Sequence, residues 1–181
     1  ETNVGHLSSD AMAGRNNNSP GGAAARDYVI DFLQSYTTGA IPGQSGDAAY
    51  EQSFPQGVNV IGKITGTVRP DEYVVIGAHY DHHASCGNID GDTICNGATD
   101  NATGTAMVLQ MSIMFAGRPP DRSVVFALWD AEEDGLLGSQ YYVNNPVVPL
   151  EDTVAYLNLD IQGANLLPSL SNNTFAIGAE S

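Results

Sequence analysis

Histidine and carboxylate side chains follow the apolar segments of this sequence in groups. The groups are His79-Tyr80-Asp81-His82-His83, Gly97-Ala98-Thr99-Asp100-Asn101-Ala102, Asp130-Ala131-Glu132-Glu133-Asp134 and a lone Asp160. Acidic residues before helices often only cap backbone amides, and for Asp100, Glu132 or Glu133 alone that interpretation is sufficient. Together, carboxylates crowded at one edge of a sheet would repel one another and raise each other's pKa values. A bound dication would remove this repulsion, so the groups indicate a metal site.

The residue types favour zinc over other cations. Imidazole together with carboxylate suits zinc, whereas calcium and magnesium prefer shells made of oxygen alone. A single zinc ion with three protein ligands would need fewer carboxylates than these groups contain. The surplus indicates two metal ions about 3.5–4 Å apart, bridged by one carboxylate.

Strands are predicted directly before the polar groups. Near-continuous apolar runs are typical of strands covered on both faces. The predicted strands span residues 58–64, 72–78, 123–129 and 153–159, and residues 175–178 begin a further one. Ligands in sheets of this type gather at the carboxyl ends of the strands. We therefore expect the polar groups to meet at one edge of the sheet.

Helices are predicted by apolar residues at helical spacing. They span residues 23–36, 102–116 and 136–143, with a short helical turn at 7–15 and a surface connection at 37–47. Strands that alternate with helices predict an α/β fold. The expected architecture is a three-layer sandwich with a mixed, largely parallel central sheet flanked by helices. With 181 residues, the chain suits one domain or a large piece of one.

The charge balance excludes several classes of partner. Lys and Arg number 6 against 21 Asp and Glu, which gives a net charge of −15. Nucleic-acid binding and attraction to anionic lipid both require basic residues. No apolar run in the sequence approaches the roughly 20 residues that span a bilayer. We therefore expect no nucleic-acid partner and no membrane partner.

The two cysteines, Cys86 and Cys95, flank a polar, turn-rich segment. A disulfide that closes so short a loop would contribute roughly 2.5–3 kcal/mol to stability. Two free buried thiols are the alternative. A disulfide would imply a secreted or periplasmic protein. The sequence begins at Glu1 without a signal segment, so we expect that any leader has already been removed.

Four segments stand in an order that points to one family. They are AHYDH at 78–82, GATDNATG at 97–104, AEEDGLLGS at 131–139 and LNLD at 157–160. The sequence resembles the double-zinc aminopeptidase family, which includes bacterial leucyl aminopeptidases and aminopeptidase Y. Residues 7–15 and 59–62 also look like the start of that catalytic domain. The resemblance covers nearly the whole chain, and it implies a zinc exopeptidase-like fold.

The resemblance implies two Zn2+ ions per complete active site and a role for each candidate residue. The metal ligands would be His79 and Asp160 on one zinc, Glu133 on the second, and Asp100 as the bridge. Glu132 would be the general base that takes a proton from a metal-bridging water. Asp81 would accept the other ring N–H of His79 and fix its tautomer. A cis peptide bond would join Asp100 to Asn101.

One ligand of the family's pattern is missing from this sequence. The family's second zinc takes a histidine from late in the domain, whereas the last histidine here is His83. The family's domain is also longer, which implies a single catalytic domain that lacks its C-terminal part. A second chain or a missing segment would then supply the ligand. His82 and His83 themselves are expected to be loop residues, with one of them as an alternative lining of the pocket.

The leading expectation is a zinc aminopeptidase that releases N-terminal, apolar residues from peptides. Alternatives of the same clan are a glutaminyl cyclase, which uses a similar fold with one zinc, and a carboxypeptidase. A non-catalytic, receptor-like domain is a further alternative, and the missing late histidine is its best support. A calcium-binding adhesive module would rest on residues 88–92, which lack the distal Glu of an EF-hand and resemble a plain turn.

Overall fold

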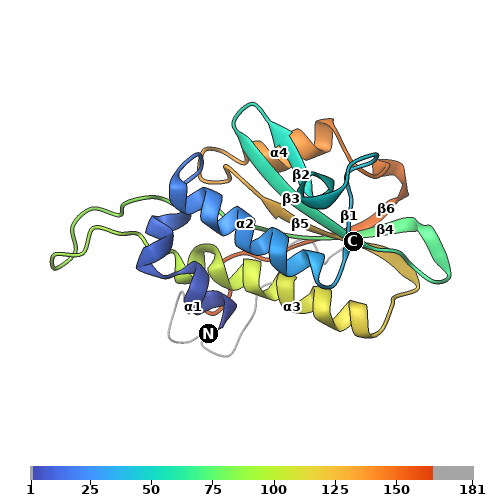
Figure 1. The fold of residues 1–181 in the computed structure, drawn as a ribbon, viewed down its shortest axis with the longest axis horizontal. Coiled ribbons are helices and arrows are strands. Elements are labelled where there is room, and N and C mark those ends of the chain that lie inside the picture. The colour runs from blue at the N-terminus through green and yellow to red at the C-terminus, as the bar shows by residue number, and fades with distance from the viewer. Residues whose placement is uncertain (1, 165–181) are drawn as a thin grey trace.

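A six-stranded mixed sheet forms the centre of the structure, a computed structural model that describes residues 2–164 (Figure 1). Its strands follow the spatial order β1-β3-β5-β4-β6, and β2 pairs with β3 outside this path. They are β1 Thr38–Gly39, β2 Glu51–Phe54, β3 Gly57–Ile64, β4 Arg69–His79, β5 Arg122–Trp129 and β6 Thr153–Asn158. The further strand expected at 175–178 lies outside the described residues.

The parallel part of the sheet is smaller than expected. β4 runs parallel to β5 and β6, whereas β3 is antiparallel to β1, β2 and β5. The sheet is therefore mixed, as predicted, but it is not largely parallel. Short connections explain the difference, because residues 55–56 and 65–68 join consecutive strands. Placing a strand parallel in the same sheet takes a crossover of roughly a dozen residues or more.

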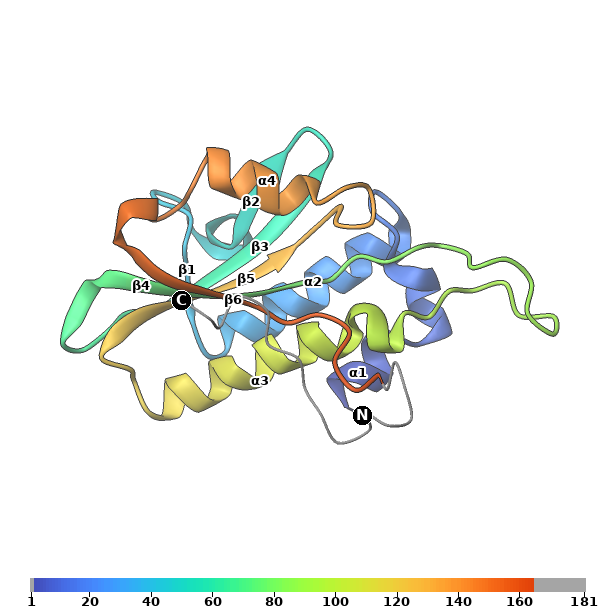
Figure 2. The ribbon, with the colours of Figure 1, turned by 180° about the vertical axis from the view of Figure 1, so that it is seen from behind.

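Helices cover both faces of the sheet and complete three layers (Figure 2). Three helices lie on one face and one on the other: α1 Asn3–Leu7, α2 Pro20–Gln34 and α3 Thr103–Gly117 on the first, and α4 Leu137–Asn144 on the second. On the first face, Leu33 and Leu109 join a buried cluster with Phe126. On the other face, Tyr142 packs on Trp129 with ring centroids 5.1 Å apart.

Helix α2 begins earlier than the residue pattern predicts. The predicted helix starts at residue 23, whereas α2 starts at Pro20. The hydroxyl of Ser19 accepts the N–H of Gly22 at 3.0 Å, and proline fits the first helical position because it has no N–H to satisfy. A capping residue and a proline therefore extend the helix beyond its apolar pattern.

Strand β6 is the outermost strand on one side of the sheet, as far as residues 2–164 show. Its side chains Val154, Tyr156 and Leu157 are 52%, 52% and 45% exposed.

None of the helices in the described part of the chain has both the length and the apolar character to cross a bilayer.

Candidate metal centre

The register of three parallel strands brings the predicted groups together. His79, the last residue of β4, pairs with Trp129 at the end of β5. On the other side of β4, Gly77 pairs with Asn158. The residues that follow β5 and β6 therefore emerge on both sides of His79. Asp160 and the pair of glutamates after Trp129 reach the same edge of the sheet, as the sequence predicts.

The ring of His79 lies at the centre of this arrangement. Its side chain is buried, and Nε2 lies 3.1 Å from Oδ1 of Asp100 and 3.5 Å from Oδ1 of Asp160. Oε2 of Glu132 is farther away, at 3.9 Å from the same nitrogen. A carboxylate from each of the three other groups therefore lies within 3.9 Å of Nε2 of His79.

Asp81 holds the site together in a way that differs from the expectation. The nearest partner of Nδ1 of His79 is the backbone carbonyl of Asp81 at 3.1 Å, while the carboxylate lies at 3.6 Å. That carboxylate accepts the backbone N–H groups of Glu132 at 3.2 Å and Glu133 at 3.3 Å. Asp81 thus contacts the ring of His79 most closely through its backbone carbonyl. Its side chain holds the backbone of Glu132 and Glu133, the glutamate turn that follows β5.

Asn101 connects the two aspartates. The peptide bond between Asp100 and Asn101 is cis, as the resemblance implies. The side-chain amide of Asn101 donates to the carbonyl of Leu159 at 2.9 Å, one residue before Asp160. Its side-chain oxygen accepts the N–H of Gly104 at 3.0 Å, in the first turn of α3.

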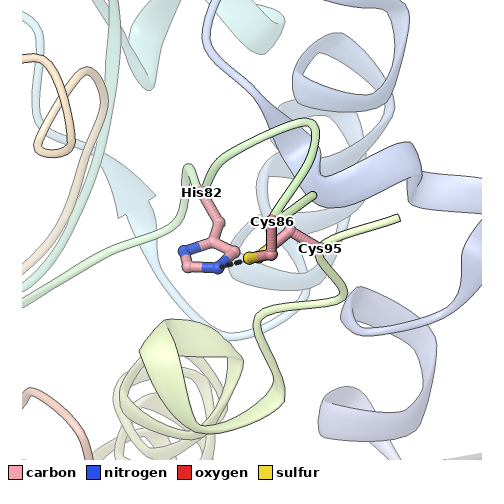
Figure 3. Close-up of side chains that lie close together, drawn as sticks. All are labelled: His82, Cys86 and Cys95. Atoms are coloured by element: carbon pink, nitrogen blue, oxygen red, sulfur yellow. Dashed lines mark hydrogen bonds between the residues drawn. A yellow bond between two sulfur atoms is a disulfide. The ribbon is translucent and has the colours of Figure 1, made fainter. Parts of the chain in front are cut away.

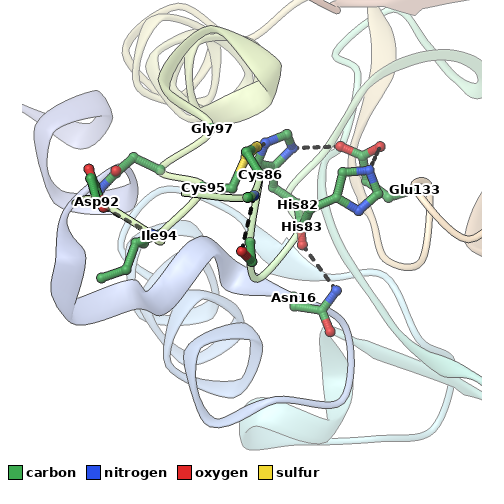
Figure 4. Close-up of a disulfide and its surroundings, with 12 residues drawn as sticks. Asn16, His82, His83, Cys86, Asp92, Ile94, Cys95, Gly97 and Glu133 are labelled. Atoms are coloured by element: carbon green, nitrogen blue, oxygen red, sulfur yellow. Dashed lines mark hydrogen bonds and ion pairs between the residues drawn. A yellow bond between two sulfur atoms is a disulfide. The ribbon is translucent and has the colours of Figure 1, made fainter. Parts of the chain in front are cut away.

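Glu133 faces two histidines. Its Oε1 lies 2.5 Å from Nδ1 of His82, and its Oε2 lies 3.2 Å from Nε2 of His83 (Figure 4). Both histidines are in the loop after β4, as predicted, but their contact with Glu133 was not foreseen. The available signal was their position directly after Asp81, in the loop that leaves the ligand-bearing edge.

Several overlapping groups of ligand atoms among the described residues could hold a metal ion. Two of them share Asp100: one is His79, Asp100 and Asp160, and the other is His82, Asp100 and Glu133. A third group is His79, Glu132 and Glu133. Within each group the ligand atoms lie within 4.8 Å of one another. Asp100 belongs to two of these groups, which is the position a bridging carboxylate requires.

The electrostatics of the site fit a cation. Oδ1 of Asp160 is buried without a hydrogen-bond partner among the described residues. Burial alone would lower the pKa of His79, but the carboxylates around it, above all Asp160 and Asp81, raise that pKa to about 10. The His79 ring in turn lowers the pKa of Asp160. Burial raises the pKa of Glu132. The carboxylates thus favour a positive charge at the place where a metal ion would bind.

Arg15 is a further organising residue that sequence reasoning missed. Its fully buried guanidinium donates to the carbonyls of Leu7 at 2.6 Å, Tyr80 at 3.0 Å, Asn96 at 2.8 Å and Gly97 at 3.0 Å. Burial lowers the pKa of Arg15 to about 10. The side chain joins the N-terminal segment to the loops on either side of the ligands. Two signals in the sequence were available: Arg15 is one of only 6 basic residues, and it ends the segment 7–15 that resembles the start of the family's catalytic domain.

The disulfide between Cys86 and Cys95 is present, as predicted. The two Cα atoms are 5.0 Å apart, and the segment between them closes on itself through Ile89 and Asp92. Sγ of Cys95 lies 3.0 Å from Nε2 of His82 (Figure 3). The disulfide therefore anchors the loop that carries His82.

A cleft of about 410 Å³ opens beside His79 and Glu132. Its apolar lining includes Trp129 from the end of β5 and Val143 from α4. Tyr156 of β6 completes this apolar wall. The cleft can therefore hold an apolar side chain next to the candidate metal site.

Gly104 allows α3 to approach the ligand segments closely. A Cβ atom there would lie 2.3 Å from the carbonyl oxygen of Leu159 and 2.4 Å from Oδ1 of Asn101. We predict that Gly104→Ala lowers the free energy of unfolding by about 1–3 kcal/mol and weakens metal binding. Gly117, at the other end of α3, meets nothing within 4 Å, so Gly117→Ala is the matched control. Urea unfolding and zinc titration measure both effects, and equal behaviour of the two variants would contradict the prediction.

Comparison with known curated proteins finds relatives that are longer than this chain. Aminopeptidase NAALADL1 of Mus musculus is 39% identical over 110 residues, which cover 57% of this chain and 13% of the relative. A probable zinc metalloprotease of Pyricularia oryzae is 30% identical over 151 residues, or 78% and 30% of the two chains. A probable glutamate carboxypeptidase of Arthroderma benhamiae is 34% identical over 161 residues, or 84% and 21%. The chain spans less than a third of the length of each.

Comparison of folds and family profiles agrees with the resemblance noted in the sequence. A Zn-dependent exopeptidase from Parabacteroides distasonis has a TM-score of 0.68 and 21% identity, covering 90% of this chain and 60% of the other. This likeness confirms the expected sandwich of helices around a mixed sheet. The family described as "Peptidase family M28" matches residues 59–177, which carry all the candidate ligands. Because this match covers more than half of the sequence, the chain belongs to peptidase family M28.

Proposed function

We propose that this chain carries the metal-binding part of a zinc-dependent aminopeptidase. The observation that supports it most directly is the convergence of Asp100 and Asp160 on Nε2 of His79, at 3.1 and 3.5 Å. In this assignment His79 and Asp160 would hold one zinc, Glu133 would hold a second, and Asp100 would be shared between them. Membership of a metallopeptidase family supports hydrolysis of peptide bonds as the reaction.

Zinc held by these residues would supply Lewis-acid chemistry for the hydrolysis of a peptide bond. Glu132 is assigned as the general base that accepts the proton of the attacking water and delivers it to the leaving amine. Its Oε2 lies 3.9 Å from Nε2 of His79, outside hydrogen-bond distance, which leaves the carboxylate free to move a proton. Burial raises the pKa of Glu132, which brings it closer to the operating range of a base.

Aminopeptidase specificity rests on two observations. The apolar cleft that begins at His79 and Glu132 suits an apolar N-terminal side chain. The relative from Mus musculus is named an aminopeptidase. The relative from Arthroderma benhamiae is named a glutamate carboxypeptidase, which makes carboxypeptidase activity the second candidate.

A secreted or periplasmic location is part of the same proposal. Its support is the disulfide between Cys86 and Cys95, because disulfides persist in oxidising compartments. Peptides are the proposed substrates. Neither nucleic acid nor a membrane is a proposed partner, in keeping with the net charge of −15.

Peptide hydrolysis on matched substrates tests the proposal. We expect the zinc-loaded protein to release leucine from a Leu-Gly-Gly peptide and to leave its N-acetylated form intact. A chelator should abolish turnover, and added zinc should restore it. Release of the C-terminal residue from the acetylated peptide would establish a carboxypeptidase instead. Cyclisation of an N-terminal glutaminyl peptide would establish a cyclase. Absence of zinc-dependent turnover with every substrate, in a protein that has bound two zinc ions, would favour a receptor-like domain.

A further inference from the structure

Asn59 is a wholly buried residue of β3 that has no part in the chemistry proposed above. It opens the segment 59–62, which resembles the start of the family's catalytic domain. Its side-chain oxygen accepts the N–H of Asp130 at 3.1 Å, and its side-chain nitrogen donates to the carbonyl of Gly138 at 2.8 Å. The same nitrogen donates to the side-chain oxygen of Gln52 at 3.0 Å. Because an amide nitrogen has two hydrogens to donate, both polar atoms of this side chain are fully engaged.

The partners Asp130 and Gly138 are the two ends of one loop. This loop, residues 130–138, runs from the end of β5 into the first turn of α4 and carries both Glu132 and Glu133. The N–H of Gly138 donates to the carbonyl of Asp130 at 3.1 Å, so the ends of the loop meet. Asn59 therefore bonds to both ends of the closed loop that presents the assigned base.

The backbone of the loop 130–138 needs such a restraint. Ala131 has a φ of +53° and Leu136 a φ of +62°, and these two residues flank the glutamate turn. Residues other than glycine rarely adopt this left-handed conformation, and they keep it only where the surrounding structure holds them. The bonds from Asn59 to the ends of the loop supply part of that restraint.

Further contacts tie the same end of the loop to β3. The carboxylate of Asp130 accepts the N–H of Val58 at 2.9 Å and that of Ala131 at 2.9 Å. Gly138 lets α4 approach this point closely, because a Cβ atom there would lie 2.3 Å from Oδ1 of Asn59 and 2.3 Å from the carbonyl oxygen of Asp130. Strand β3 is therefore the support to which the ends of the loop 130–138 are attached.

We propose that Asn59 is a positioning residue for the base: by holding both ends of the loop 130–138, its amide fixes the carboxylate of Glu132 relative to the metal ligands. This inference rests on the proposed function, in which Glu132 moves the proton. The side-chain hydrogen bonds of Asn59 within residues 2–164 go to Asp130, Gly138 and Gln52, so zinc binding should not depend on it. Catalysis should depend on it, because a displacement of about 1 Å in a reacting group can cost about 100-fold in rate.

Asn59→Leu removes the amide and keeps a side chain of similar size. We expect this variant to bind zinc and substrate like the wild type, with KM unchanged, and to lose about 10–100-fold in kcat per folded, zinc-loaded molecule. Gln52→Leu is the matched control, since it removes a buried amide from the same network but leaves both bonds to the loop, and its kcat should equal that of the wild type. If Asn59→Leu does not fold, Asn59→Thr carries the same comparison, because threonine suits a strand and keeps a hydroxyl.

The substitution Glu132→Gln separates the positioning of the base from a general loss of structure. Once the base is replaced, adding Asn59→Leu should lower kcat by less than about threefold, because residues that act through one group have non-additive effects. Damage that does not act through the base would lower kcat by the same factor whether or not Glu132 is replaced, and this result would overturn the inference.

Amide hydrogen exchange tests the restraint without any measurement of turnover. In Asn59→Leu, the N–H groups of the loop 130–138 should exchange at least about tenfold faster than in the wild type, and their acceleration should exceed that of β4, which reports any loss of overall stability. Equal acceleration in the loop and in β4, or none in the loop, would overturn the inference. A wild-type protein that binds zinc and hydrolyses no peptide would contradict the proposed function instead, and faster exchange confined to the loop would still support Asn59 as its restraint.

Discussion

Replacement of Glu132 by glutamine is expected to lower kcat/KM for peptide hydrolysis by about 10²–10⁴-fold while zinc content stays unchanged. The amide keeps the size of the side chain but cannot accept the proton of the attacking water. Since Glu132 belongs to the glutamate turn fixed by Asp81, the variant should keep the geometry of the site. Steady-state kinetics and zinc analysis on one preparation measure both quantities.

Glu151→Gln is the matched control for this substitution. Glu151 is exposed and lies before β6, away from the ligand-bearing edge, so its variant should hydrolyse peptides at the wild-type rate. If Glu132→Gln retained activity within a few-fold of the wild type, Glu132 would not be the base. If it lost zinc, Glu132 would be a ligand.

Replacement of Arg15 by methionine is expected to cost at least about 3 kcal/mol of the free energy of unfolding. The substitution leaves buried carbonyls of Leu7, Tyr80, Asn96 and Gly97 without their donor. Each buried acceptor left without a partner costs about 1–3 kcal/mol. Because two of these carbonyls adjoin ligand segments, metal binding should weaken as well. Urea unfolding under non-reducing conditions measures the stability.

Two control variants, Arg118→Met and Arg15→Lys, separate the effect of the four hydrogen bonds from other effects of the substitution. Arg118 is exposed after α3, so Arg118→Met should change stability by less than about 0.5 kcal/mol. Arg15→Lys keeps the positive charge, but its compact ammonium group has only three N–H donors. Its free energy of unfolding should therefore lie between those of Arg15→Met and the wild type. Unfolding midpoints of Arg15→Met and Arg118→Met that coincide would show that the four hydrogen bonds do not organise the fold.

The four longer strands, β3 to β6, and the main ligand edge were predictable from local apolar patterns, whereas the short strands β1 and β2 were not predicted, and β1 lies in the segment 37–47 that was expected to be a surface connection. A continuous apolar run predicts a buried strand, and its last residue, His79 or Trp129, marks the carboxyl end of that strand. Parallel pairing then brings Asp160 to His79 without any further information. The order of the strands in the sheet was harder to predict. The direction of β3 depends on connections of a few residues, and its neighbour in the sheet is β5 rather than β4, the next strand in the sequence.

Two of the contacts that escaped prediction join segments far apart in the sequence. The bond of Arg15 to Gly97 and the contact of His82 with Glu133 depend on how loops fold over the edge of the sheet. No periodic pattern encodes such contacts. Asp81 is a local exception, because Nδ1 of His79 lies nearer to its backbone carbonyl, at 3.1 Å, than to the carboxylate from which the contact was expected, at 3.6 Å.

The open side of β6 has a consequence for the behaviour of the chain in solution. Within residues 2–164, β6 is an outermost strand, and its exposed Val154, Tyr156 and Leu157 present apolar surface to another molecule. The net charge of −15 opposes such self-association through long-range repulsion. Salt shortens the reach of that repulsion to about 10 Å at 0.1 M. We therefore expect added salt to favour association of the described fold through β6.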